Sequence, residues 1–221
     1  MLKVCEIFGP TIQGEGPTAG KIISFVRLSF CNLRCVWCDT KYTWTAENVM
    51  EMTALQVVVS LELQGVKAVA ISGGEPLLQQ DQLVELLELL RASDYWIEIE
   101  TNGTIIPLPR ISQLVHQFNC SIKLSNSGML EVKRLWPDAI KTFAASPRSC
   151  FKFVVSARED ISEILALVGQ YKLKRVYLMP EGQTKEELEQ HERLTRELCE
   201  MFNFSFSPRL HITQFGGVRG R

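Results

Sequence analysis

Apolar segments rich in β-branched and aromatic residues recur along the chain, separated by segments whose apolar residues repeat every three or four positions. The first pattern predicts strands and the second predicts amphipathic helices. The predicted strands are residues 21–30, 66–72, 95–101, 120–124, 151–156 and 175–179, with a last strand over 204–212. The predicted helices are residues 53–64, 81–92, 112–118, 160–170 and 184–201. Residues 125–150 show no clear pattern.

Strands that alternate with helices form βα units, and successive units of this kind build a parallel sheet. The six or seven predicted strands are fewer than the eight of a closed (βα) barrel, and 221 residues are near the lower length limit of one. The sequence therefore predicts an α/β fold, an incomplete and open (βα) barrel, in a single domain over residues 1–221. Such folds bind their ligands at the carboxyl ends of the strands.

Composition and charge argue against a nucleic-acid-binding, membrane or secreted protein. The chain has 24 Lys and Arg against 25 Asp and Glu, a formal charge of −1, and so has no overall positive field for nucleic acid. No apolar run approaches the roughly 18–20 residues of a membrane span, and the N-terminus lacks the apolar stretch of a secretory signal. We therefore expect a cytoplasmic protein that binds neither nucleic acid nor membrane.

The seven cysteines are unevenly placed. Cys31, Cys35 and Cys38 lie within eight residues, and the others are scattered at Cys5, Cys120, Cys150 and Cys199. Disulfide frameworks are typical of smaller secreted chains, so metal ligation is the better interpretation of the three close cysteines. Three thiolates can bind one metal ion or an iron–sulfur cluster, but no nearby His or Cys supplies the fourth ligand of a structural zinc site. Structural zinc and reduced cysteines without a metal remain the alternatives.

The C-x3-C-x2-C spacing, with Trp37 just before the last cysteine, resembles the radical S-adenosylmethionine (SAM) superfamily. A predicted strand precedes this loop, and the next strand ends in Ser72-Gly-Gly-Glu-Pro76, which is similar to the superfamily's glycine-rich element. The resemblance implies a [4Fe–4S] cluster held by the three cysteines, whose remaining iron chelates the amino and carboxylate groups of SAM. It further implies that the reduced cluster cleaves SAM to methionine and a 5′-deoxyadenosyl radical.

Further motifs, which occur in a fixed order along the chain, narrow the resemblance to one family within this superfamily. These motifs are Glu6-Ile-Phe, Thr11-Ile-Gln-Gly-Glu-Gly16, Arg27, Cys31-Asn-Leu, Cys38-Asp-Thr40, Glu100-Thr-Asn-Gly103, Ser121-Ile-Lys123, Met179-Pro180 and His211. Together they resemble the 7-carboxy-7-deazaguanine synthase family. The resemblance implies a lyase that converts 6-carboxy-5,6,7,8-tetrahydropterin to 7-carboxy-7-deazaguanine with loss of ammonia, on the route to queuosine and other deazapurines. It also implies Mg²⁺, a homodimer and an electron donor such as flavodoxin or ferredoxin.

The family resemblance assigns the pterin substrate to seven residues, which are Ile12, Gln13, Gly14, Glu15, Arg27, Ser72 and His211. Arg27 could hold the substrate carboxylate through a bidentate pair. A carboxylate in the loop 13–15 would match the paired N–H donors of the pterin edge. The alternatives are a solvated strand arginine, a flexible surface loop and, for His211, a partly buried structural histidine.

The resemblance also assigns cofactor contacts. Those to SAM fall on Trp37, Cys38, Asp39, Gly74, Ser121, Ile122, Lys123, Met179, Pro180 and Glu181. The Thr40 hydroxyl is implied as a Mg²⁺ ligand with the substrate carboxylate bridging, whereas without the family Asp39-Thr40 would be interpreted as a turn. The sequence 121–123 has isoleucine at the middle position, where many members have the proline of Ser-Pro-Lys. Glu75 and Glu100 lie in matching motifs without a predicted role.

Two other functions share part of this pattern. An activase that places a glycyl radical on a partner protein would carry the same cysteine loop and glycine-rich element. It would not need the loop 13–16, Arg27 and Thr40 together. A non-catalytic iron–sulfur or zinc module is a second alternative, and cleavage of SAM under reducing, oxygen-free conditions would distinguish an enzyme from it.

Overall fold

The computed structural model describes residues 1–47 and 49–220. These residues form one nine-stranded sheet in the order β3-β1-β2-β4-β5-β6-β7-β8-β9. The strands are β1 (Leu2–Ile12), β2 (Ile22–Leu28), β3 (Met50–Met52), β4 (Ala68–Gly73), β5 (Trp96–Thr101), β6 (Gln117–Cys120), β7 (Ser149–Val155), β8 (Val176–Pro180) and β9 (Ser205–Phe206). β1 is antiparallel to β2 and β3, and all other pairings are parallel.

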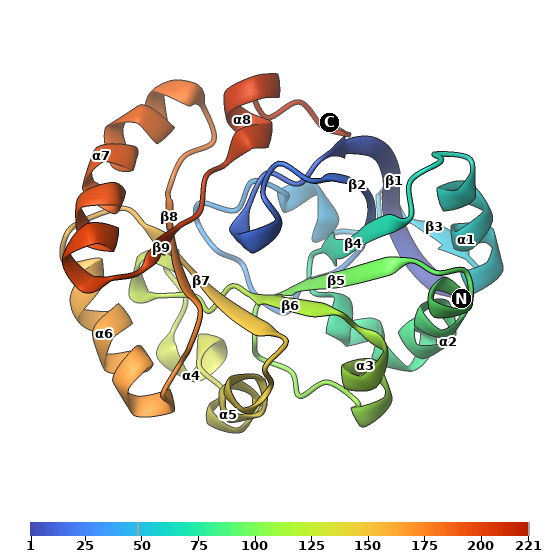
Figure 1. Cartoon of the computed structure of the whole chain (residues 1–221), viewed down its shortest axis with the longest axis horizontal. Coiled ribbons are helices and arrows are strands. Elements are labelled where there is room, and N and C mark those ends of the chain that lie inside the picture. The colour runs from blue at the N-terminus through green and yellow to red at the C-terminus, as the bar shows by residue number, and fades with distance from the viewer. Residues whose placement is uncertain (48, 221) are drawn as a thin grey trace.

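Helices cover the outer side of this curved sheet (Figure 1). They are α1 (Ala54–Glu62), α2 (Gln80–Ala92), α3 (Pro109–Leu114), α4 (Glu131–Arg134), α5 (Pro137–Ala145), α6 (Asp160–Tyr171) and α7 (Lys185–Phe202). The last helix, α8 (Leu210–Phe215), lies instead at the end of the barrel, against the loop between β1 and β2 (Figure 1). Within the described residues the outermost strands, β3 and β9, do not pair with each other, so the barrel is open. The predicted incomplete (βα) barrel with a parallel sheet is therefore confirmed. None of these helices combines the length and the apolar composition needed to cross a bilayer.

The predicted apolar faces form the core. All seven residues of β7 are buried. α2 buries one face, formed by Leu83, Leu86, Leu87 and Leu90, which are spaced three or four residues apart or adjacent. α1 begins at a capping box, in which the Thr53 hydroxyl accepts from the Gln56 N–H and the Gln56 side chain accepts from the Thr53 N–H. The apolar core therefore lies between the sheet and the helices, while strands also carry buried polar side chains such as Glu98 on β5 and Lys152 on β7.

The hydrophobic pattern does not predict β1 or β3, which add to the six or seven expected strands. The pairing of β1 with β2 shifts register between Phe8 and Thr11, across Gly9-Pro10. This shift interrupts the strict alternation by which a half-buried strand is recognised. β3 has only three residues, too few for a periodic pattern.

The strand predicted over 120–124 and the end of the helix predicted over 112–118 are wrong. The helix α3 ends at Leu114, and the strand β6 then ends at Cys120. Two of the four residues of β6, Gln117 and Asn119, are polar and nevertheless buried. Their side chains obscure the apolar run that marks an interior strand of a parallel sheet.

The strand predicted over 204–212 is also wrong beyond its start. β9 covers two residues, and the chain then turns into α8. The Ser207 hydroxyl accepts from the Gly16 N–H at 2.8 Å, and the Leu210 N–H donates to the Gly14 carbonyl at 3.0 Å. The backbone after β9 therefore pairs with the β1–β2 loop instead of continuing the sheet.

Candidate active site

A cavity of about 290 Å³ lies at the carboxyl ends of the parallel strands. The predicted site residues that line it are Ile12, Gln13, Gly14, Glu15, Arg27, Cys31, Cys35, Trp37, Cys38, Asp39, Thr40, Ser72, Gly74, Ser121, Lys123, Met179, Glu181 and His211. Ile122 and Pro180 do not line it, since Ile122 packs in the core and Pro180 is buried at the end of β8. The fold thus brings motifs spread over some two hundred residues to one cavity.

The glycine-rich segment lies against the start of the cysteine loop. The Gly74 N–H donates to the Leu28 carbonyl at 3.0 Å, and the Glu75 N–H donates to the Phe30 carbonyl at 2.8 Å. A Cβ at Gly74 would overlap the Phe30 carbonyl. Only glycine allows such a close backbone approach, and this contact sets where Cys31 enters the cavity.

The three close cysteines face the cavity, and the other four are buried away from it. Burial raises the pKa of the Cys31 thiol to about 11 and also raises the pKa of Cys35. A thiol of this kind becomes a thiolate when a metal cation binds the sulfur and displaces the proton to solvent. The loop 31–38 is therefore suited to a metal and is not suited to a free reactive thiol.

The spacing of the sulfurs bears on the kind of metal. Within residues 1–47 and 49–220, ligand atoms from three His, Cys, Asp or Glu side chains lie within 4.8 Å of one another only at Glu15, Asp39 and His211. Zn–S bonds of about 2.3 Å would place the thiolates of one tetrahedral zinc about 3.8 Å apart. The three cysteines do not form such a group, so at least one pair of their sulfurs is more than 4.8 Å apart, which is wider than one zinc ion requires and is compatible with a multinuclear iron–sulfur cluster.

Glu75, which had no predicted role, joins the cysteine loop to the neighbouring strand. Its carboxylate is buried and accepts from the Asn102 N–H at 2.7 Å, the Thr101 hydroxyl at 2.9 Å and the Leu77 N–H at 3.0 Å. Burial raises the pKa of Glu75, although these hydrogen bonds oppose the shift. The Asn102 side chain in turn donates to Asn32 at 2.8 Å. Glu75 is therefore a structural residue beneath the cluster site.

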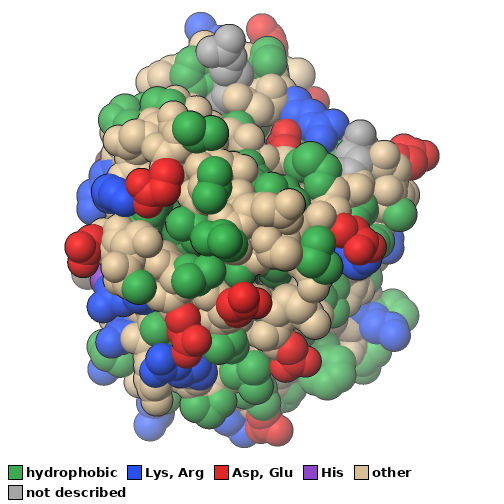
Figure 2. All heavy atoms as spheres, turned by 90° about the vertical axis from the view of Figure 1, so that its right-hand side faces the viewer, with side chains coloured by type: hydrophobic (Ala, Val, Ile, Leu, Met, Phe, Trp, Pro, Cys, Tyr) green, Lys and Arg blue, Asp and Glu red, His purple; other side chains and the backbone are tan. Residues whose placement is uncertain are grey.

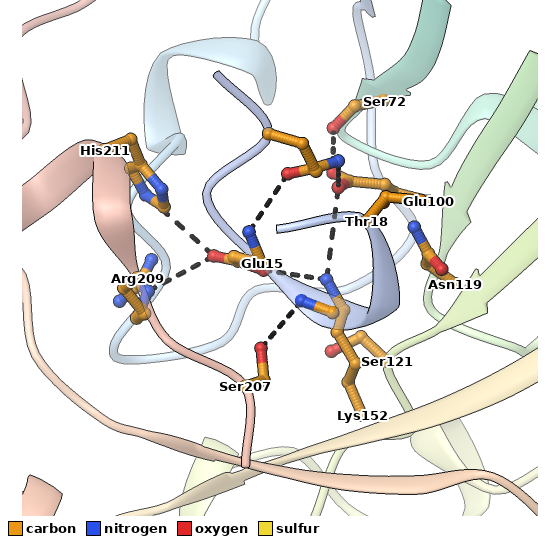
Figure 3. Close-up of polar contacts among 12 residues, drawn as sticks. Glu15, Thr18, Ser72, Glu100, Asn119, Ser121, Lys152, Ser207, Arg209 and His211 are labelled. Atoms are coloured by element: carbon orange, nitrogen blue, oxygen red, sulfur yellow. Dashed lines mark hydrogen bonds and ion pairs between the residues drawn. The ribbon is translucent and has the colours of Figure 1, made fainter. Parts of the chain in front are cut away.

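Glu15 lies at the centre of a charged network beside the cavity (Figure 3). Lys152, from β7, approaches one carboxylate oxygen at 2.7 Å, and Arg209 approaches the other at 3.2 Å. Burial alone would raise the pKa of Glu15, but the charges of Lys152 and Arg209 outweigh it and hold the pKa well below its usual range. Glu15 is therefore an anion at neutral pH, and buried cations balance its charge.

The segment after β9 completes this side of the cavity. His211 packs on Gly14, where a Cβ would overlap the ring, and burial lowers the pKa of His211, so the imidazole is mainly neutral at pH 7. Arg209 pairs with Asp39 as well as with Glu15. Arg209 therefore balances the charge of Glu15 and Asp39, the two carboxylates that lie close to His211.

Gln13 connects the β1–β2 loop to two acids on β5. Its side-chain N–H donates to Glu98 and, at 3.1 Å, to Glu100, and its carbonyl accepts from the Glu15 N–H at 3.1 Å. The Ser72 hydroxyl donates to Glu100 at 2.8 Å. Burial, together with the nearby Glu100, raises the pKa of Glu98 to about 7. The residues predicted to bind the pterin are thus fixed by buried hydrogen bonds and do not form a flexible surface loop.

Arg27 lines the cavity but is also paired inside the protein. Its Nε donates to Glu6 at 2.8 Å, the residue opposite it on β1. The Tyr42 hydroxyl and Arg219 donate to the same carboxylate at 2.7 and 3.0 Å. No described residue accepts a hydrogen bond from either Nη of Arg27, so that side of the guanidinium remains for a ligand.

The predicted cofactor residues lie beside the cysteines. The Trp37 ring N–H donates to the Asn126 carbonyl at 3.1 Å. The Lys123 ammonium lies 5.2 Å from the Trp37 ring centroid and donates to the Ser121 hydroxyl at 2.8 Å. The Cys38 sulfur lies 3.5 Å from the Thr40 hydroxyl.

Several residues of this site were not predicted. Lys152, Arg209 and Tyr42 line the cavity and belong to none of the motifs. For Lys152 a signal was present, since it is a single charge within the apolar strand 151–156. Arg209 gave no comparable signal, because it follows a very short strand and its partners are remote in sequence.

Comparison with known proteins gives consistent results. Residues 25–195 match the family model of the radical SAM superfamily. A Pyrobaculum aerophilum protein named 7-carboxy-7-deazaguanine synthase is 38% identical, over 100% of this chain and 97% of that protein. A Hyperthermus butylicus protein of the same name is 36% identical, over 96% and 92%. Among solved structures, QueE from Escherichia coli is similar with a TM-score of 0.71 and 26% identity, over 93% of this chain and 92% of that one.

Proposed function

The chain belongs to the radical SAM superfamily and, within it, to the 7-carboxy-7-deazaguanine synthases, and we propose on that basis that it converts 6-carboxy-5,6,7,8-tetrahydropterin to 7-carboxy-7-deazaguanine with loss of ammonia. The relatives give no support to a glycyl-radical activase. The observation that carries the proposal is that three cysteines and an enclosed polar network suited to a small anionic heterocycle line the same cavity.

The cavity would hold the iron–sulfur cluster and SAM together. When bound, they supply the 5′-deoxyadenosyl radical that removes a hydrogen atom from the substrate. Cys31, Cys35 and Cys38 would hold the cluster, and their positions in the cavity fit that role. The segments 121–123 and 179–181 would bind SAM, with Trp37 and the backbone at Gly74.

The residues of the chain bind and orient the pterin. The free side of the Arg27 guanidinium suits the substrate carboxylate. A carboxylate has about four acceptor sites, so Glu15 can accept from pterin N–H groups while Lys152 and Arg209 keep it ionised. Ser72 and His211 complete the pocket. Holding the substrate in a fixed position near the cluster lowers the entropic cost of the radical step.

The proposed reaction is tested by an anaerobic assay with reconstituted protein, SAM, a chemical reductant and the carboxy-tetrahydropterin. We expect the assay to show 7-carboxy-7-deazaguanine and ammonia. Because the loss of ammonia is redox-neutral, the hydrogen atom that is removed must be returned, so 5′-deoxyadenosine is expected only from uncoupled cleavage of SAM. Cleavage of SAM without any deazapurine product would contradict the proposed substrate while leaving the superfamily assignment intact.

Replacing Arg27 by lysine is expected to raise the KM for the pterin at least tenfold. The ammonium keeps the charge and can pair with Glu6, but it loses the planar fork that reaches a second carboxylate. One lost charge-assisted hydrogen bond costs roughly 1.5–3 kcal/mol, and each 1.4 kcal/mol or so is a factor of ten. Iron content should not change. If the substrate dependence is unaltered, Arg27 serves only as the partner of Glu6.

Turnover is expected to depend on Mg²⁺ through Thr40. A hydroxyl is a weak ligand, so we propose that the ion binds well only when substrate oxygens share its coordination. Thr40→Ala should lower the rate or weaken the Mg²⁺ dependence, and Thr40→Ser should retain most of the activity. The measurement is initial rate against Mg²⁺ concentration after chelator treatment. Superimposable curves for the wild type and Thr40→Ala would contradict this assignment.

We propose that the chain forms a homodimer through one exposed apolar face. Figure 2 shows apolar side chains on the side that carries α1 and β3. The exposed fractions there are 46% for Met50, 61% for Leu55, 52% for Val59 and 86% for Leu63. A second copy would cover this surface. Sedimentation velocity should then give a dimer, and a monomer at micromolar concentration would contradict it.

A further inference from the structure

The side of the cysteine loop that faces away from the cavity carries a second exposed apolar surface. We call it the loop patch, and it consists of Arg34, Val36, Leu130, Val132, Lys133 and Trp136. Its apolar members are 61% (Val36), 72% (Leu130), 74% (Val132) and 52% (Trp136) exposed. None of these six residues lines the cavity. Cys35, next to Val36 in the chain, is buried and faces the cavity.

Contacts join the two parts of the loop patch. The Val36 N–H donates to the Ser127 carbonyl at 3.0 Å. Val36 also covers Gly128, where a Cβ would come within 2.8 Å of its methyl group. The Arg34 N–H lies 3.3 Å from the Met129 sulfur. The cysteine loop and the segment that begins at Leu130 therefore lie side by side.

The segment 130–136 is held firmly in spite of its exposed apolar side chains. Arg134, in the short helix α4, is buried, pairs with Glu163 at 2.5 Å and donates to the Lys123 carbonyl at 2.9 Å. This arrangement presents Val132 and Trp136 to solvent on an ordered backbone. Exposed apolar patches that contain an aromatic residue are typical of protein interaction sites, and an ordered backbone lowers the entropic cost of binding.

We propose that the loop patch docks a small acidic electron-carrier protein that reduces the cluster. This inference rests on the proposed function, in which the cluster must receive one electron before SAM is cleaved. One electron would leave the reduced carrier, which is oxidised, and enter the cluster, which is reduced. A carrier on the patch would be separated from the cluster by the loop that carries Cys35 and Val36, while the cavity stays free for SAM and the pterin.

The charge at the patch favours an acidic partner. Arg34 and Lys133 flank the apolar side chains and are exposed, and Glu131 is the acidic residue within the segment. The local balance is positive, whereas the whole chain has a formal charge of −1. Opposite charges on the edges of two contacting surfaces increase the rate of association and make that rate sensitive to salt. Electron-transfer contacts are also small, typically below about 1,200 Å², so such a partner does not need an extended interface.

The test compares two reductants on the reconstituted enzyme. Val132→Glu and Trp136→Glu place a negative charge on the patch away from the cysteines. With a purified bacterial flavodoxin as the electron donor, we expect the donor concentration for half-maximal SAM cleavage to rise at least tenfold. With dithionite, which needs no docking surface, cleavage should stay within about twofold of wild type. Met201→Glu is the matched control, because Met201 is 64% exposed in α7, outside the patch, and should change neither assay.

Two outcomes would overturn the docking proposal. One is an unchanged flavodoxin dependence in the Val132→Glu, Trp136→Glu double variant. The other is an equal loss with flavodoxin and dithionite, which would mean that the segment only supports the cysteine loop. Failure of the proposed function looks different, because the wild type would then not cleave SAM with either reductant.

Discussion

Replacing Cys35 by alanine is expected to abolish both the iron–sulfur absorbance and the cleavage of SAM. Cys35 lines the cavity between two other cysteines, and none of the remaining four cysteines lines it. A cluster with three protein thiolates has no local substitute for one that is lost. We expect less than about one iron per chain after reconstitution and SAM cleavage at least a thousandfold below wild type. The measurements are iron and sulfide content, visible absorbance and 5′-deoxyadenosine formed under dithionite.

The control for this variant is Cys199→Ala. Cys199 is also buried, and burial raises the pKa of its thiol to about 11, but it lies in α7 away from the cavity. Four irons per chain and unchanged SAM cleavage are expected. A full cluster in Cys35→Ala, or its loss in Cys199→Ala, would show that the ligands have been assigned to the wrong cysteines.

Lys152→Met is expected to give the second large effect, on both stability and turnover. The Lys152 side chain is 3% exposed and lies 2.7 Å from Glu15 and 4.0 Å from Glu100. Without Lys152 only Arg209, which Asp39 shares, is left to balance Glu15, and removing one partner of a buried ion pair costs roughly 3–5 kcal/mol. The kcat/KM for the pterin should fall about a hundredfold, since small displacements of a binding group have effects of that size. Lys141→Met, at an exposed ion pair with Asp138, should change stability by less than about 0.5 kcal/mol.

The pH dependence of the stability loss gives an independent test. The folded pKa of Glu15 is depressed, so this residue stabilises the fold above its unfolded pKa of about 4.3 and loses that contribution as the pH falls. The folded pKa of Lys152 is raised mainly by Glu15 and Glu100, against the effect of burial, so its contribution is fully present below an unfolded pKa of about 10.4. The difference in unfolding free energy between wild type and Lys152→Met should therefore be largest between about pH 6 and 10.

The same difference should narrow toward pH 4, where protonation relieves the unpaired carboxylates. The measurement is chemical denaturation at several pH values. A difference that stays constant from pH 4 to 9 would indicate lost packing of the lysine stem, without a role for its charge.

More of the chemistry of this site than of its architecture could be predicted from the sequence. The cysteine spacing and the two glycines are local in the chain, and Gly74 shows why, because its backbone contact with Phe30 excludes any side chain. Apolar runs likewise predict β4 and β7, whose central residues are buried. These features depend on neighbouring residues or on simple periodicity, and both can be read directly from the chain.

The remaining features depend on partners that are distant in sequence. β6 was misplaced because Gln117 and Asn119 are polar, and they are buried only because they hydrogen-bond to each other and to the strands beside them. Lys152 and Arg209 belong to the site because they pair with Glu15. No sequence pattern near either residue indicates this pairing. A propensity argument treats such residues as surface groups, and only the tertiary structure shows that their charges are balanced.

The contacts of Glu15 also have a consequence for the order of events during synthesis. Its two cationic partners are 137 and 194 residues further along the chain. At about 5–20 residues per second, Arg209 leaves the ribosome roughly 10–40 s after Glu15. β1, β2 and β4 can pair early, but the loop with Gln13 and Glu15 stays hydrated until the segment after β9 has been translated. The nascent chain therefore displays its cysteine loop before it has a complete substrate pocket, and during this interval the thiols depend on the cell, not on the fold, for protection from oxygen.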